Sequence, residues 1–266
     1  MPLTSRGRRR KALAQPFPDT WRALLMEHMV HWRMLDARER ERAEKLIRLL
    51  LADKLWEASS GFALTEEIRV LVSAMASMLI LELDYEYYHR VTSIVVSPST
   101  THMSGEHYVG NGVFSDAPMA LVGLSAHSGP VVIAWDAARA EALHPEEGKN
   151  VVYHEFAHKL DAEDGSSNGA PPFETDTELR SWVAVATPEY ESLRRGHVDG
   201  VLDPYGATNP AEFFAVVTEA FFNRPLLLEA QRPELYAGLR RFYNQHPAAR
   251  ERRALKDGGE FQRPNQ

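Results

Sequence analysis

The residues best suited to chemistry lie in the segment 151–161, which contains the pattern His-Glu-x-x-His. His154 and His158 are four positions apart, so on a helix they lie one turn above each other and can direct their imidazole nitrogens at one point. Glu155 follows the first histidine and could contact a water on a bound metal ion without being a ligand. This arrangement is typical of metal-dependent hydrolysis.

The neighbouring residues predict this helix independently of the motif. Val152, Phe156 and Leu160 recur every four positions, on the side away from the two histidines. One face of the helix would therefore pack, and the other would be free for chemistry. Composition makes the motif only moderately rare, because the chain has 11 His and 37 acidic residues. The alternative is a helix with two ordinary histidines and an exposed glutamate.

A catalytic zinc site uses three protein ligands and leaves one position for water, so a third ligand must come from elsewhere. The segment 205–219 offers Glu212 and, two turns later, Glu219. Pro210 fits the first position of a helix with Asn209 as its N-cap, which places Glu212 in the first turn. The same spacing matches a capping box, in which the Glu212 carboxylate bonds back to the Asn209 N–H. The residues alone leave both roles open.

Two stretches carry a resemblance to a known family. The stretch from His154 to Asp161 and the stretch from Tyr205 to Ala215 resemble the Mlc titration factor A family of zinc metallopeptidases. They are also similar to the zinc-peptidase domain of anthrax lethal factor, and the likeness spans about residues 21–243. One departure is visible, since lethal factor carries a carboxylate where this chain has Val216.

The resemblance implies an α+β, zincin-like metallopeptidase, mainly helical with a small mixed sheet beside the active-site helix. It implies one Zn²⁺ per chain held by His154, His158 and Glu212, with Glu155 as general base and Tyr205 at the catalytic centre. It favours aminopeptidase-like cleavage of a peptide or protein substrate. The alternative is a regulatory protein that sequesters a transcriptional repressor of sugar uptake such as Mlc, with peptidase activity secondary.

The departure at Val216 removes a carboxylate that could orient a ligand histidine. Glu219 or Asp161 would then have to orient it instead.

Composition is that of an ordinary globular protein, with 44% hydrophobic and 25% charged residues. There is no cysteine, which excludes disulfides and thiolate metal sites and favours a cytoplasmic location. The longest apolar run, residues 70–83, is interrupted by polar side chains and is too short to span a bilayer. We therefore expect no membrane association.

We expect a disordered basic tail over residues 1–18, a single catalytic domain over 19–248 and a flexible tail over 249–266. Within the domain, residues 19–90 are predicted to be helical, and 91–248 to hold the sheet, the active-site helix and the third-ligand helix. The basic residues of the first tail, Arg6 to Lys11, could contact nucleic acid. The formal net charge of −7 favours a solvated tail instead.

Changes in the spacing of apolar side chains mark the expected helices and strands within the domain. Residues 36–57 read as one amphipathic helix, and two helices are expected over 173–185 and 188–193. Residues 91–96 and 129–135 are rich in β-branched side chains and predict strands. The strand at 129–135 could offer its edge to an extended peptide substrate, or it could be an ordinary buried strand.

Four residues of the loop-rich segment 100–128 could be metal ligands by type, but no spacing places two of them on one face. We treat them as loop residues: His102, Glu106, His107 and His127.

Overall fold

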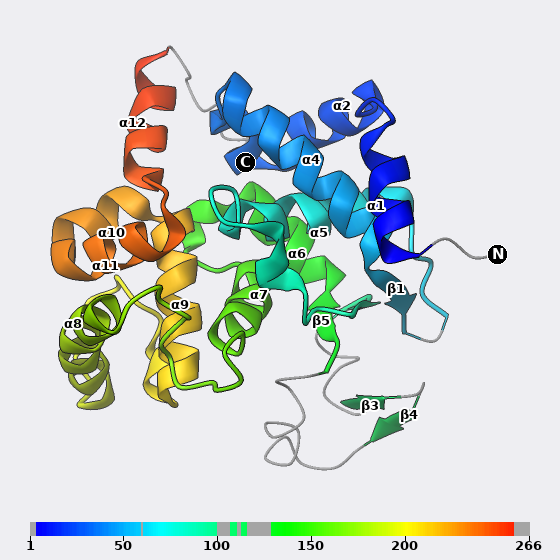
Figure 1. The fold of residues 1–266 in the computed structure, drawn as a ribbon. Helices are drawn as coiled ribbons and strands as arrows, with labels where there is room; N and C mark the ends of the chain where they lie inside the picture. The colour runs from blue at the N-terminus through cyan, green and yellow to red at the C-terminus, as the bar shows by residue number, and fades with distance from the viewer. Residues whose placement is uncertain (1–3, 60, 100–106, 111–112, 116–128, 258–266) are drawn as a thin grey trace.

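The computed structural model describes residues 4–59, 61–99, 107–110, 113–115 and 129–257. Helices dominate, and the small sheet lies at one end of the helical body (Figure 1). The α-helices are α1 (Ser5–Leu13), α2 (Asp19–His28), α3 (Val30–Met34), α4 (Ala37–Asp53), α5 (Glu66–Leu79), α6 (Trp135–Leu143), α7 (Val151–Asp161), α8 (Asp176–Arg194), α9 (Pro210–Asn223), α10 (Pro225–Gln231), α11 (Pro233–Tyr243) and α12 (Pro247–Lys256). Short 3-10 helices are η1 (Tyr85–Tyr88), η4 (Pro145–Glu147) and η5 (Pro204–Ala207).

The sheet has three strands in the order β1-β2-β5, and both neighbouring pairs are parallel. These strands are β1 (Leu55–Ala58), β2 (Ser93–Ser97) and β5 (Val131–Ala134). The prediction of a mixed sheet was therefore wrong for this sheet: α5 crosses over between β1 and β2, and such a crossover returns the chain in the same direction. A separate antiparallel pair consists of β3 (His107–Gly110) and β4 (Val113–Ser115).

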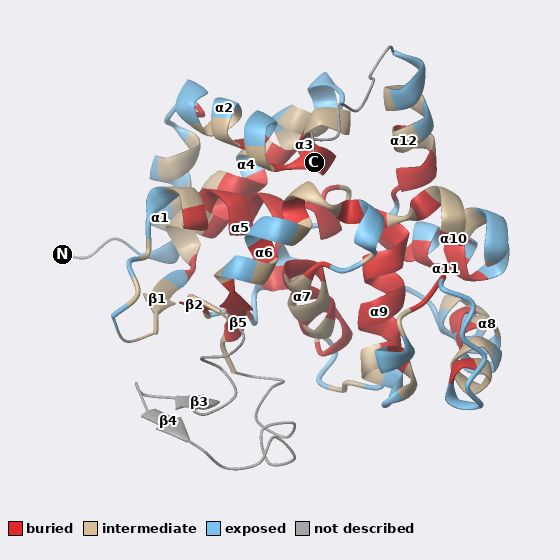
Figure 2. Ribbon diagram, turned by 180° about the vertical axis from the view of Figure 1, so that it is seen from behind, coloured by how far each residue is buried: buried red, intermediate tan, exposed pale blue. Residues whose placement is uncertain are grey.

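Two helices form the centre of the molecule and are buried along most of their length, namely α5 and α9 (Figure 2). Thr65 caps α5 by accepting a hydrogen bond from the N–H of Ile68. Helix α7 lies between β5 and α9 (Figure 1), so the predicted active-site helix contacts both the sheet and the predicted third-ligand helix. Among the described residues, no helix is long and apolar enough to cross a membrane.

The structure differs from the expected basic tail, because residues 5–13 form α1 and dock on α4. Arg8 Nε donates to the Ala52 carbonyl at 3.0 Å, and Arg9 pairs with Asp53 at 2.8 Å. Both contacts lie at the C-terminal end of α4, where the helix dipole and unpaired carbonyls stabilise cations. Arg8 and Arg9 of the basic cluster thus hold α1 on α4, through partners 44 residues away in the sequence.

The C-terminal boundary also differs from the expectation of a flexible tail beginning at residue 249. Helix α12 continues to Lys256, and its buried Arg250 pairs with Glu39 of α4 at 2.9 Å. An ion pair between distant segments leaves no periodic pattern in the sequence of either one.

Two predicted helix boundaries were wrong. The helix expected over 36–57 ends at Asp53, because the chain turns at Lys54 and pairs β1 with β2. The two helices expected over 173–193 are one helix, α8, with Pro188 inside it. Proline removes only one intrahelical hydrogen bond, so a long helix tolerates it when packing holds both halves.

Candidate metal centre

Helix α7 presents its two histidines as the sequence predicted. Asn150 caps the helix by accepting a hydrogen bond from the N–H of Tyr153 at 3.0 Å. Val152, Phe156 and Leu160 have no exposed surface and form the packed face. The opposite face carries His154 and His158, both only partly buried. The hydrophobic face therefore fixes the direction in which the two imidazoles point.

Helix α9 brings Glu212 to the same point. Asn209 caps it by accepting from the Glu212 N–H at 2.9 Å, and Pro210 occupies its first position. Phe213, Phe214 and their apolar neighbours are buried, which leaves the Glu212 side chain facing α7. The first turn of α9 therefore lies beside the histidine face of α7.

Three potential ligand atoms converge between α7 and α9. Glu212 Oε2 lies 2.9 Å from His154 Nε2 and 3.3 Å from His158 Nε2, and the two imidazole nitrogens are 3.2 Å apart. Four ligands at about 2.0 Å from a tetrahedral zinc ion are separated by about 3.3 Å. The donor set of two imidazoles and one carboxylate therefore fits zinc in spacing as well as in chemistry.

The Glu212 carboxylate does not form a capping box, which is one of the two roles that the sequence left open. A capping box would direct this side chain back to Asn209, but Oε2 points at the two histidines instead. Burial opposes ionisation, yet hydrogen bonds from His154 and His158 lower the pKa of Glu212 to about 2. Glu212 is therefore an anion aimed at the histidine pair.

Glu219 orients the His154 imidazole through Nδ1, the ring nitrogen that does not face Glu212. Its Oε1 accepts a hydrogen bond from His154 Nδ1 at 2.8 Å, which directs Nε2 toward Glu212. Burial would lower the pKa of His154, but its hydrogen bonds with Glu212 and Glu219 and the nearby carboxylate charges raise it to about 10. The same carboxylates would stabilise a divalent cation, which competes with the proton for Nε2.

Asp161, the other residue expected to orient a histidine, holds a loop. Its Oδ2 accepts from the Gly169 N–H at 3.1 Å. Gly169 packs against α9 so closely that a Cβ there would lie 2.2 Å from the Pro210 carbonyl oxygen. Asp161 thus ties the end of α7 to the start of α9. This contact helps to set the spacing between the two predicted ligand helices.

The two predicted catalytic residues lie around the same point. The ring of Tyr205 is 5.9 Å from that of His154, centre to centre, and the tyrosine is 47% exposed. Partial burial, and then the negative charges of Glu212 and Glu155, raise the pKa of Tyr205. Its phenol is therefore a protonated hydrogen-bond donor at neutral pH. Glu155 follows His154 on α7, its side chain is partly exposed, and its charge acts on both His154 and Tyr205.

Several contacts of the site escaped the sequence analysis. The Asn150 N–H donates to Glu219 Oε2 at 2.6 Å, and Lys159 Nζ donates to the Gly129 carbonyl, just before β5, at 2.9 Å. Val216, where the departure from lethal factor lies, packs beneath Gly206 in the turn that carries Tyr205. Of the four loop candidates, His102, Glu106 and His127 lie outside the described residues, as does the side chain of His107.

Comparison with known proteins agrees with this geometry. Residues 3–244 match the model of a family described as glucose-regulated metallo-peptidase M90. The chain belongs to this family. An uncharacterized protein of Synechocystis sp. is 33% identical over 244 residues, covering 90% of this chain and 89% of that protein.

Two further relatives are named Mlc titration factor A. The protein from Serratia proteamaculans is 31% identical over 222 residues, covering 81% of this chain and 84% of that protein. The protein from Yersinia pestis is 30% identical over 225 residues, covering 82% of each chain. The predicted family is therefore confirmed, and the chain is an M90 metallopeptidase with a His-His-Glu candidate metal site.

Proposed function

We propose that the protein hydrolyses peptide bonds with one zinc ion held by His154, His158 and Glu212. The observation that carries this proposal is the convergence of their three ligand atoms at spacings that suit tetrahedral zinc. Zinc at this point would polarise a peptide carbonyl and make water acidic enough to be a nucleophile near neutral pH.

The protein's own groups would move the protons. Glu155 takes a proton from the attacking water and delivers it to the amine of the leaving group. Tyr205 donates its phenol O–H to the oxygen that becomes negative in the tetrahedral intermediate. Glu219 holds the His154 ring in the orientation that exposes Nε2.

The substrate would lie along β5. This strand pairs with β2 on one side, and no pairing on its other side is present among the described residues. It contacts α7, so an extended peptide added to its edge would run past the candidate metal centre. The family resemblance favours aminopeptidase-like cleavage of short peptides.

Hydrolysis of aminoacyl substrates and internally quenched peptides by the zinc-loaded protein tests this proposal. Zinc-loaded Glu155→Gln is the control, because it keeps the proposed ligands and loses only the base. We expect turnover in the wild type alone, with equal zinc content in both. The substrates that are cut distinguish aminopeptidase from endopeptidase action. Absence of turnover in the zinc-loaded wild type contradicts the proposal.

A second candidate function is binding of a transcriptional repressor such as Mlc, and the names of the Serratia and Yersinia relatives favour it. Immobilised Glu155→Gln protein would then retain purified Mlc without cleaving it. Failure to retain Mlc at micromolar concentrations would leave the peptidase as the function of this chain.

A further inference from the structure

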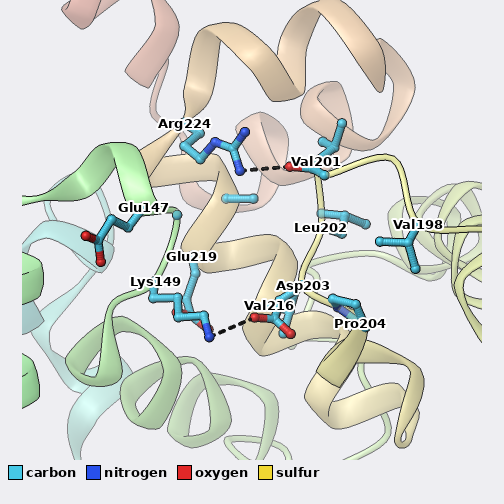
Figure 3. Close-up of a pocket in the computed structure, with 13 residues that line it drawn as sticks. Glu147, Lys149, Val198, Val201, Leu202, Asp203, Pro204, Val216, Glu219 and Arg224 are labelled. Atoms are coloured by element: carbon cyan, nitrogen blue, oxygen red, sulfur yellow. Dashed lines mark hydrogen bonds and ion pairs between the residues drawn. The ribbon is translucent and has the colours of Figure 1, made fainter.

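The turn that carries Tyr205 is attached to the body of the protein by a charged contact at its beginning. Asp203 caps η5, and its Oδ1 accepts a hydrogen bond from the Tyr205 N–H at 2.9 Å. The other oxygen, Oδ2, lies 3.2 Å from Lys149 Nζ, and Figure 3 shows the two side chains reaching toward each other across a cavity. One carboxylate therefore holds both the backbone of Tyr205 and a lysine from another segment.

Lys149 belongs to the segment that leads into α7, and its backbone is fixed. The Lys149 carbonyl accepts a hydrogen bond from Asn223 Nδ2 at 2.9 Å, and the next residue, Asn150, donates its N–H to Glu219 at 2.6 Å. Both partners are on α9. The lysine therefore extends from a support that also determines where α7 begins.

The other side of the Tyr205 turn rests on α9. A Cβ at Gly206 would lie 3.3 Å from Val216 Cβ and 3.2 Å from a methyl group of Leu193, so the backbone of the turn is in close contact with both helices. This contact supports the turn on one side. The link from Lys149 through Asp203 to the Tyr205 N–H supplies a second attachment at the beginning of the turn.

We infer that Lys149 and Asp203 are positioning residues that direct the phenol of Tyr205 at the reacting carbonyl. This inference rests on the proposed peptidase function, in which Tyr205 is a catalytic residue. Lys149 and Asp203 act only through Tyr205, so their contribution to turnover must disappear when the phenol oxygen is removed. A merely structural role would persist without that oxygen.

A double-mutant cycle measures this dependence. An exposed ion pair contributes less than 1 kcal/mol, so Lys149→Met should lower kcat about threefold. Asp203→Ala also loses the cap and should lower kcat about tenfold. KM and zinc content should stay near wild type.

In the Tyr205→Phe background, neither Lys149→Met nor Asp203→Ala should lower kcat further by more than about twofold. Arg38→Met removes an ion pair with Glu82 that includes no residue of the candidate site, so it should leave kcat unchanged in both backgrounds.

Amide hydrogen exchange provides a readout that needs no turnover. In Asp203→Ala, the amides of Tyr205 and Gly206 should exchange severalfold faster than in wild type, while those of α9 stay protected. The inference is overturned if these two amides exchange at the wild-type rate, or if the kcat losses multiply fully with that of Tyr205→Phe. A wild type without turnover contradicts the proposed function instead, and hydrogen exchange then decides whether the two residues hold the turn.

Discussion

Glu219 joins the imidazole of His154 to the beginning of α7. One carboxylate oxygen lies 2.8 Å from His154 Nδ1, and the other accepts from the Asn150 N–H at 2.6 Å. Asn150 is the N-cap of the helix that carries His154, so a single side chain of α9 fixes both the helix origin and the ring. The same helix carries Glu212, and all three proposed ligands therefore depend on how α7 and α9 pack.

Replacing Glu219 by Gln should weaken zinc binding about 10- to 100-fold, because a neutral amide orients His154 less firmly and withdraws a negative charge. Competition with a chelator measures the affinity. Glu141→Gln is the matched control, since Glu141 also accepts a backbone hydrogen bond at the start of α7, from Val151 at 2.5 Å. Equal losses in the two variants would show that Glu219 acts on the helix alone.

Gly169 should tolerate no side chain. A Cβ there would lie 2.2 Å from the Pro210 carbonyl oxygen, and its φ of +77° is unfavourable for other residues. Gly169→Ala should therefore destabilise the protein by about 3 kcal/mol. Gly165 has a similar φ of +96° and open space around its Cβ, so Gly165→Ala should cost about 1 kcal/mol. Urea unfolding measures both. Equal costs would mean that the backbone at Pro210 shifts to accommodate the added Cβ, which would contradict the prediction.

His31 should make folding stability depend on pH. It is buried and its Nε2 donates to the Phe222 carbonyl at 3.0 Å, while burial lowers its pKa from 6.5 to about 4. As pH falls from 6.5 to 4, the unfolded chain binds this proton first, so the free energy of unfolding should fall by about 3 kcal/mol.

The variant His31→Gln keeps a donor for the Phe222 carbonyl but cannot titrate. Unfolding in urea at pH 7 and pH 4.5 should therefore show a smaller loss of stability in the variant than in wild type. Identical losses would assign the pH dependence to other groups.

Arg250 should anchor α12. Burial alone would raise the pKa of Glu39, but the charge of Arg250 and several hydrogen bonds hold it below its ordinary value. Arg250→Met leaves the Glu39 carboxylate with less compensation and should destabilise the protein by about 3 kcal/mol at pH 7. The difference from wild type should shrink below pH 4.5, as Glu39 becomes protonated. A difference that is constant down to pH 2 would contradict this account.

The sequence predicted those parts of the site that depend on local patterns. The apolar face of α7, the Asn209 cap of α9 and the direction of the two histidines all follow from spacing within one helix. Contacts between segments far apart in the chain could not be predicted from the sequence. The choice of Glu219 over Asp161 depends on how α7 and α9 pack, and no periodicity encodes that.

Dependence on distant partners also explains the errors in the predicted fold. Strand β1 was hidden because residues 36–57 have a continuous helical pattern, and only pairing with β2 ends the helix at Asp53. Helix α1 depends on the end of α4, and α12 depends on Glu39. Each of these elements is specified by a partner that lies far away in the chain.

The zinc content of Glu212→Ala tests the central claim most directly. Glu178→Ala is its matched control, because Glu178 occupies the same first-turn position of α8 but closes a capping box with Thr175. After zinc loading and removal of free metal, wild type and Glu178→Ala should hold one zinc ion per chain, and Glu212→Ala should hold almost none. One zinc ion per chain in Glu212→Ala, bound as tightly as in wild type, would contradict the assignment of Glu212 as the third ligand.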